Sequence, residues 1–364
     1  MNLFIRTSIA PYRIDIYNAL HERLDMKMCF YYRTGSSQAF DADSLERKCA
    51  FKPVYLDGIR LGSDNRKLCF GIWRLLRREK PALVIVPEFQ IVLLQVLFYR
   101  WITRGKFKVV SMIDDSFDMI SNDNDFTRLH ARLRTVLPKY LDDLIVVTPE
   151  VREWYRQRFG KGIWMPIIMN EQKARAYYGS LLPRSAELAA EYDLEGRKVL
   201  LAVNRLVALK NLYRVIEAFN MAETDSVLVI VGDGPERGNL EAAASRCGKR
   251  IIFTGRLEGD DLYAWYNISG ALILASWQEA FGAVTNEALL AGCRVIVSRN
   301  AGSSCLVNDD NGEIVDPTDV RGMARAVDRQ LAVSGIRDLS VPGKNLMSVS
   351  FEERISNLVV ELTQ

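Results

Sequence analysis

The chain has 364 residues, more than one average domain needs and enough for two domains of about 170 residues each. Hydrophobic residues make up 49% and charged residues 26%, a balance that excludes disordered and fibrous proteins. Residues 1–180 hold 29 basic and 20 acidic residues, a net charge of +9, whereas residues 181–364 hold 19 and 25, a net charge of −6. The basic half is either a solvated surface or a surface for anionic lipid or a phosphate-bearing acceptor.

The six cysteines include no C-x-x-C pair, and the two histidines lie far apart, which argues against zinc fingers and a disulfide framework. We therefore expect a reduced, cytosolic compartment, and the first residues show no secretory signal. The most apolar long stretch, residues 82–102, contains Pro87, Glu88 and Arg100. It favours a buried strand followed by a core helix over a membrane span.

Strand-like runs alternate with helical patterns along the whole chain. The predicted strands are Asn2–Thr7, Lys27–Tyr32, Leu83–Val86, Lys108–Ile113, Asp143–Thr148, Lys198–Val203, Ser226–Val231, Arg250–Thr254, Ala271–Ala275, Arg294–Ser298 and Gly312–Val315. The predicted helices are Tyr12–Leu24, Arg66–Glu79, Thr127–Tyr140, Leu212–Asn220, Gly238–Cys247, Asp260–Ile268 and Val284–Ala291. This alternation predicts an α/β protein with two Rossmann-like, doubly wound parallel-sheet domains in tandem and a cleft between them.

A domain boundary is predicted near Pro166, because residues 167–194 form a polar and irregular segment and a new strand begins at Lys198. The expected domains are residues 1–168 and 169–348, with 349–364 as a terminal segment. Ligands of such sheets bind beyond the carboxyl ends of the strands, so candidate residues are sought there.

Two loops at predicted strand ends carry candidate groups. Arg205 and Lys210 follow the strand Lys198–Val203, and two cations on one loop can hold a diphosphate without a metal ion. The alternative is a pair of solvated loop charges. Gly232 follows the strand Ser226–Val231, and glycine permits a close backbone approach to a ligand, although a simple strand-to-helix turn explains it equally well.

The strongest candidate segment follows the strand Ala271–Ala275. It places Glu279 in a loop and Glu287 about one turn inside a helix. The backbone N–H groups of Phe281–Ala283 would lie at the helix N-terminus, an anion site. A helix glutamate can accept hydrogen bonds from ribose hydroxyls, and a loop glutamate can reach sugar hydroxyls. A glutamate favoured by the helix dipole is the alternative, but it leaves Gly282 unexplained.

These segments together resemble the family 4 glycosyltransferases, which are retaining enzymes of the two-Rossmann-domain GT-B fold. The resemblance rests on Val203–Asn211, Val231–Glu236 and Ser276–Gly292, and on the segment that begins at Phe351. It implies a terminal helix, residues 349–364, that crosses back to the N-terminal domain. It also implies that residues 1–168 bind the acceptor and residues 169–348 bind a nucleotide sugar.

Carried over by the resemblance, the catalytic residues are Arg205, Lys210 and Glu279, and the donor-binding residues are Glu287, Phe281, Gly282, Ala283, Gly232 and Arg256. The implied mechanism is front-face displacement with retained configuration, in which the leaving phosphate takes the acceptor proton. No protein base, metal ion or other cofactor is then expected.

The sequence departs from the family pattern in its N-terminal half. Thr7–Arg13 contains proline and tyrosine where many members have glycines, which resembles the branch that builds bacterial surface polysaccharides. Asp114 and Asp115 stand where many members place a histidine, and they are either sugar or acceptor contacts or helix-capping residues. Glu88 and Arg13 are further candidates on the acceptor side.

The resemblance implies a UDP- or GDP-linked donor and a glycan or lipid-linked acceptor. Peripheral contact of the basic N-terminal domain with anionic lipid at the inner membrane face is a further expectation from its charge, and no nucleic-acid partner is expected. Alternatives are a GT-B nucleotide-sugar epimerase and a non-catalytic binding module. A nicotinamide oxidoreductase is disfavoured because Gly232 and Gly234 lack the third glycine of its fingerprint. His21 and His130 lie within helical patterns, where catalytic roles are not expected.

Overall fold

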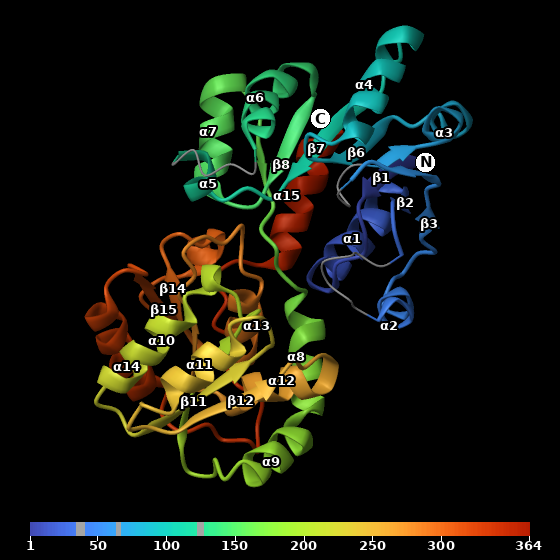
Figure 1. The fold of residues 1–364 in the computed structure, drawn as a ribbon. Helices are drawn as coiled ribbons and strands as arrows, with labels where there is room; N and C mark the ends of the chain where they lie inside the picture. The colour runs from blue at the N-terminus through green and yellow to red at the C-terminus, as the bar shows by residue number, and fades with distance from the viewer. Residues whose placement is uncertain (34–40, 63–66, 122–126) are drawn as a thin grey trace. The chain divides into compact units, whose positions relative to one another are not determined.

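The computed structural model describes residues 1–33, 41–62, 67–121 and 127–364 (Figure 1). It divides into two compact units: unit 1 comprises Met1–Met169 with Phe351–Gln364, and unit 2 comprises Asn170–Ser350. Each unit has its own parallel sheet with helices packed on it, so the α/β prediction with two doubly wound domains is confirmed.

Within its described residues, unit 1 has a seven-stranded sheet in the order β3-β2-β1-β6-β7-β8-β9, and every pair in it is parallel. Its strands are β1 (Asn2–Arg6), β2 (Met26–Phe30), β3 (Val54–Tyr55), β6 (Leu83–Pro87), β7 (Lys108–Ile113), β8 (Asp143–Val146) and β9 (Ile163–Trp164). A separate antiparallel pair is formed by β4 (Gly58–Arg60) and β5 (Lys67–Cys69). The helices are α1 (Ile14–Leu24), α2 (Ala42–Arg47), α3 (Ile72–Glu79), α4 (Ile91–Thr103), α5 (Phe117–Ser121), α6 (Arg128–Val136), α7 (Pro149–Phe159) and α15 (Phe351–Thr363), with 3-10 turns η1 (Pro11–Arg13) and η2 (Leu137–Tyr140).

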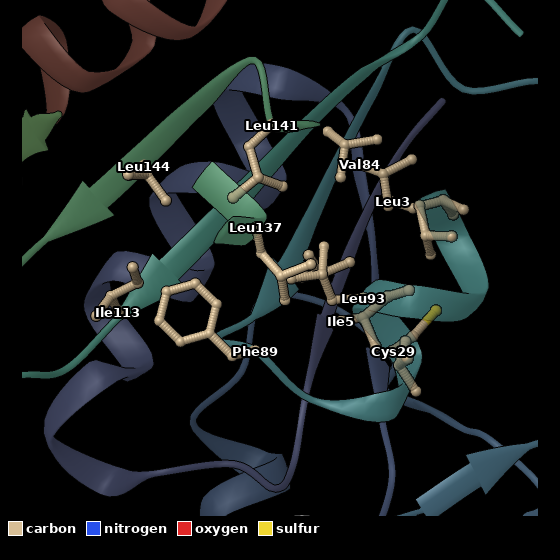
Figure 2. Close-up of a cluster of buried hydrophobic side chains, with 14 of the residues drawn as sticks. Leu3, Ile5, Cys29, Val84, Phe89, Leu93, Ile113, Leu137, Leu141 and Leu144 are labelled. Carbon is tan, nitrogen blue, oxygen red and sulfur yellow. The ribbon is translucent and has the colours of Figure 1, made fainter. Parts of the chain in front are cut away.

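The core of unit 1 forms because successive strand residues alternate between the two faces of a sheet whose faces are both covered. Figure 2 shows Leu3 and Ile5 of β1 in one cluster with Leu93 of α4 and Leu144 of β8. The C-terminal helix α15 also belongs to this unit, since it packs against α1 and β9. Arg23 of α1 binds the carboxylate of Glu352 at 2.6 Å.

Unit 2, all of whose residues are described, has a six-stranded parallel sheet in the order β12-β11-β10-β13-β14-β15. Its strands are β10 (Lys198–Val203), β11 (Ser226–Val231), β12 (Ile251–Gly255), β13 (Ala271–Leu274), β14 (Arg294–Ser298) and β15 (Gly312–Val315). The helices are α8 (Glu171–Ser180), α9 (Leu182–Glu191), α10 (Leu212–Met221), α11 (Arg237–Ala244), α12 (Gly259–Ile268), α13 (Val284–Ala291) and α14 (Val320–Ser334), with 3-10 turns η3 (Ala208–Lys210) and η4 (Gly302–Leu306).

The strand order of each sheet reverses once. In unit 1 the reversal lies between β1 and β6, and in unit 2 it lies between β10 and β13. At a reversal the loops that leave the carboxyl ends of two neighbouring strands turn away to opposite sides, which opens a crevice where ligands of doubly wound sheets bind. Site residues are therefore expected at these two points.

Five strands, β7, β10, β11, β14 and β15, have the predicted bounds. The prediction that residues 167–194 are irregular is wrong, because this segment forms α8 and α9. The side chain of Asn170 caps α8 by accepting from the backbone N–H of Lys173 at 3.0 Å, and Pro183 lies in the first turn of α9. Both starts are recognisable in the sequence, and each helix buries a narrow apolar face.

The predicted helix Arg66–Glu79 is wrong in its first part. Arg66 lies outside the described residues, Lys67–Cys69 pairs with β4 as β5, and α3 begins only at Ile72. The ammonium of Lys67 donates to the carbonyls of Tyr31 and Leu56, which fixes this segment as a strand over the sheet. The apolar residues 82–102 form β6 and most of α4, as expected.

Gly232 shows why a glycine follows β11. Its φ is +143°, and a Cβ atom there would lie 1.8 Å from the carbonyl oxygen of Asn204. The backbone N–H of Asn204 donates to the carbonyl of Val231 at 3.0 Å, and that of Leu206 donates to Asp233 at 2.9 Å. The end of β11 therefore lies so close to the loop after β10 that position 232 requires glycine, with or without a bound ligand.

We predict that Gly232→Ala lowers the free energy of unfolding by more than about 1 kcal/mol, because the added methyl group meets backbone and the φ value is unfavourable. Thermal unfolding monitored by circular dichroism measures the effect. Gly238→Ala is the matched control: Gly238 lies in α11 with open space around it, so alanine should be neutral or slightly stabilising. Equal unfolding midpoints for the two variants would contradict the explanation.

Candidate functional site

Lys210 and Glu279 join the two loops that leave the sheet of unit 2 at its strand reversal. Lys210 lies at the end of η3 after β10, Glu279 lies in the loop after β13, and their side chains form an ion pair. The side chains are only 13% and 18% exposed. The backbone N–H of Trp277 also donates to the carbonyl of Leu209 at 3.0 Å. The structure thus brings together two predicted site residues of opposite charge.

The loop that carries Glu279 is held in place by the segment after β14. The backbone N–H of Glu279 donates to the carbonyl of Asn300 at 3.3 Å, and the N–H of Gly302 donates to the carbonyl of Glu279 at 3.2 Å. The amide of Asn300 donates to the carbonyl of Trp277 at 2.9 Å. Glu279 is therefore positioned by its backbone as well as by Lys210.

Gly282 allows this loop to enter α13. Its φ is +93°, and a Cβ atom there would lie 2.5 Å from a methyl group of Leu274 and 3.1 Å from the hydroxyl of Ser303. Within the described part of the chain, the backbone N–H groups of Phe281, Gly282 and Ala283 donate no hydrogen bond to protein. Such donors at a helix N-terminus are suited to an anion.

Glu287 lies in the first turn of α13 and is only 8% exposed. Tyr266 donates its hydroxyl hydrogen bond to Oε2 at 2.6 Å, and Tyr263 donates to Oε1 at 3.3 Å. Burial raises the pKa of Glu287, and the two tyrosine hydrogen bonds partly oppose that rise. Neither tyrosine was among the predicted site residues. Their spacing of three on one helix is a weak signal for a shared face.

The two remaining basic candidates of unit 2 lie at more exposed positions. Arg205 is exposed, and among the described residues its side chain forms no ion pair and no hydrogen bond. Arg256 follows β12, is half exposed and forms an ion pair with Glu258. The structure therefore does not bring Arg205 or Arg256 into the Lys210–Glu279 pair.

In unit 1, Asp114 lies just beyond β7 and is bound by two arginines. Arg6 at the end of β1 approaches one carboxylate oxygen at 2.8 Å, and the buried Arg13 approaches the other at 2.5 Å. Burial alone would raise the pKa of Asp114, but the two guanidinium groups outweigh it and hold the pKa below its usual range. Arg6 was not among the predicted site residues, although its position at a strand end was an available signal.

Both aspartates that follow β7 are paired with arginines. Arg13 is buried against Asp114, and Asp115 is buried and paired with Arg134 of α6 at 2.8 Å. Asp114 keeps about a third of its side chain exposed, and a contact of this group with a sugar or acceptor stays a prediction.

Glu88 follows β6 and completes the same cluster. One of its carboxylate oxygens accepts a hydrogen bond from the backbone N–H of Asp114 at 3.3 Å. Burial, together with the nearby carboxylates of Asp115 and Asp114, raises the pKa of Glu88 to about 8.

Among the described residues, no group of three or more His, Cys, Asp or Glu side chains is arranged to hold a metal ion.

We predict that the stability of unit 1 falls between about pH 4.5 and pH 8 because of Glu88. A carboxyl group whose pKa is raised by folding stabilises the fold while both states are protonated, and that stabilisation is lost as the pH rises through the folded pKa. Glu88→Gln should remove this loss, so its unfolding temperature relative to wild type should rise from pH 5 to pH 9. Glu22→Gln, on an exposed position of α1, is the control. Parallel pH profiles for wild type and Glu88→Gln would contradict the prediction.

Residues 185–338, most of unit 2, match the family model described as glycosyl transferases group 1. An uncharacterized glycosyltransferase of Methanocaldococcus jannaschii is 32% identical over 187 residues, which cover 47% of this chain and 48% of that protein. The lipopolysaccharide core biosynthesis glycosyltransferase LpsD of Rhizobium meliloti is 31% identical over 58% of this chain and 60% of its own length. The chain spans about half the length of the curated relatives it matches first.

Solved structures match over the whole chain. Anabaena HepE in complex with UDP and glucose has a TM-score of 0.74 at 15% identity, covering 100% of this chain and 99% of its own. The lipopolysaccharide outer core galactosyltransferase WaaB has a TM-score of 0.71 at 16% identity, covering 100% of both chains. At this identity the likeness shows the fold. The chain therefore has the two-domain GT-B fold, and residues 185–338 match the group 1 glycosyl transferases.

Proposed function

We propose that this protein is a retaining glycosyltransferase that moves a sugar from a nucleotide-sugar donor to a glycan or lipid-linked acceptor in surface polysaccharide or glycolipid synthesis. The observation that carries the proposal is the Lys210–Glu279 pair, which lies at the strand reversal of unit 2 beside the N-terminus of α13. The family match covers these residues. The names of the lipopolysaccharide relatives favour a glycan acceptor.

In this proposal the donor diphosphate lies against Lys210 and the N–H groups of residues 281–283. Arg205 can reach the same phosphates because its side chain is exposed on the loop that ends at Lys210. Glu287 binds the ribose, Glu279 binds hydroxyls of the transferred sugar, and Arg256 lies near the base. The structures of Anabaena HepE with UDP and with UDP-glucose favour UDP over GDP as the carrier.

The chemical step that we propose needs no protein base. The acceptor oxygen forms a bond to the anomeric carbon on the face from which the phosphate departs, so the configuration is retained. The bond between that carbon and the phosphate oxygen breaks, and the acceptor proton passes to the leaving phosphate. Lys210 and the helix N–H groups stabilise the negative charge that develops there, a role that a metal ion would otherwise take.

We predict that UDP and at least one UDP-sugar raise the unfolding temperature, and that a chelator such as EDTA leaves this shift unchanged. A ligand at 100 times its Kd stabilises by about 2.7 kcal/mol, a readily measured effect. Thermal-shift assays with UDP, GDP and a panel of their sugars test this. No stabilisation by any nucleotide would contradict the donor site, and loss of the shift with EDTA would contradict metal independence.

We predict that Lys210→Ala lowers turnover about 10²-fold, because it removes a charge that stabilises the leaving diphosphate. Release of nucleoside diphosphate with and without acceptor measures the effect, and thermal unfolding verifies that the variant is folded. Arg325→Ala, on an exposed position of α14, is the control and should keep wild-type turnover. Near-normal turnover in Lys210→Ala would contradict the assignment. Isomerisation of the nucleotide sugar in the absence of an acceptor would indicate an epimerase. Binding of the nucleotide sugar without any turnover would indicate a binding module.

A further inference from the structure

Helix α4 has apolar residues on both of its faces. Val92, Leu93 and Val96 are buried against the sheet of unit 1. On the other side Leu94, Phe98, Trp101 and Ile102 are exposed, Trp101 by 74%. Their spacing of i, i+4, i+7 and i+8 places them in one stripe. A helix at the surface of a globular unit normally presents polar residues outward, so folding of unit 1 does not explain this second face.

The neighbouring helix α3 continues the exposed stripe. Trp73 of α3 is 40% exposed, and its ring centroid lies 5.7 Å from that of Phe98, which lies 5.8 Å from that of Trp101. The indole N–H of Trp73 donates to the carbonyl of Gln95 at 3.0 Å. The three rings are therefore held in a row across α3 and α4, whose positions Figure 1 shows. We call Trp73, Leu94, Phe98, Trp101 and Ile102 the aromatic face.

Exposed basic residues lie beside the aromatic face. Arg74 and Arg77 are exposed on α3, and Arg104 and Lys106 are exposed just after α4. Helix α4 contains no Asp or Glu, and the one acidic residue of α3, Glu79 at its end, is paired with Lys27 and has a side chain that is only 13% exposed. A second copy of this chain docked face to face would bring these like charges together, which is unfavourable. An anionic partner with an apolar layer fits both features.

We infer that the aromatic face docks unit 1 on the surface of a bilayer that contains anionic lipid. Tryptophan and phenylalanine insert at the boundary between head groups and acyl chains, and arginine and lysine bind the anionic head groups. At 1.5 Å per residue α4 is about 20 Å long, shorter than the roughly 30 Å hydrocarbon core. Among the helices of the described residues, none combines the length and apolarity that crossing a bilayer requires. The face therefore rests in the interface. This inference does not depend on the proposed glycosyl transfer.

The test is vesicle flotation with the full chain, without any nucleotide sugar. Wild type should float with vesicles of phosphatidylcholine and phosphatidylglycerol, bind pure phosphatidylcholine vesicles at least tenfold more weakly, and lose binding as salt rises. The double variant Phe98→Ser/Trp101→Ser should lower binding at least tenfold. Arg74→Glu/Arg77→Glu should lower binding to the anionic vesicles only.

Leu129→Ser is the matched control, because Leu129 is an exposed apolar residue on α6 in the same unit, and it should bind as wild type does. Thermal unfolding shows whether each variant is folded. Failure of folded wild type to bind anionic vesicles would overturn the inference, as would equal binding by Phe98→Ser/Trp101→Ser. Self-association that this double variant abolishes, without vesicle binding, would assign the face to a second copy instead. If the protein showed no transferase activity, the proposed function would fail, but binding of the protein to the vesicles would still test this inference.

Discussion

The ion pair between Lys210 and Glu279 is the interaction on which the candidate site of unit 2 depends. At the reversal between β10 and β13 this pair and the hydrogen bond from the Trp277 N–H to the Leu209 carbonyl hold the two loops together. A largely buried ion pair is favourable only when each partner stays close to the other, because either charge alone would be poorly solvated. The pair therefore holds the two loops together. Because the loop of Glu279 leads into α13, the pair also helps to position the N-terminus of that helix.

At the strand reversal of unit 1 the charged side chains are arranged differently from those of unit 2. Two arginines bind one carboxylate, Asp114, and a third arginine binds Asp115. Near neutral pH the raised pKa of Glu88 leaves much of it protonated, which limits the repulsion among three acids. Most of the cluster's charges are thus satisfied within unit 1. Asp114 nevertheless keeps about a third of its side chain exposed, and its contact with an acceptor, like that of Glu88, stays a prediction.

The sequence predicted the longer strands of both sheets, because apolar runs bounded by polar turns are a local signal, but it missed the short strands β3, β4, β5 and β9. It also identified Lys210, Glu279 and Asp114 as residues that follow strand ends. It did not predict their partners, since Lys210 and Glu279 are 69 residues apart and Arg13 and Asp114 are 101 apart, and no local pattern says which loops meet. The helices α8 and α9 were missed for another reason. Their residues were predicted to be irregular because they are largely polar, although Asn170 is a recognisable helix cap and narrow apolar stripes mark two amphipathic helices.

The two glycines of the site show which sequence signals carry functional information. Gly282 was expected to place backbone N–H groups at an anion site, and Gly232 was interpreted either as a close approach to a ligand or as a simple strand-to-helix turn. In the structure each is already required by packing: Gly232 by the carbonyl of Asn204, and Gly282 by Leu274 and Ser303. A glycine at a strand end therefore shows that two loops pack closely, with or without a ligand. The proposal therefore rests on the polar groups that this packing places. These are first the Lys210–Glu279 pair, and then the N–H groups of residues 281–283, which donate no hydrogen bond to protein within the described part of the chain.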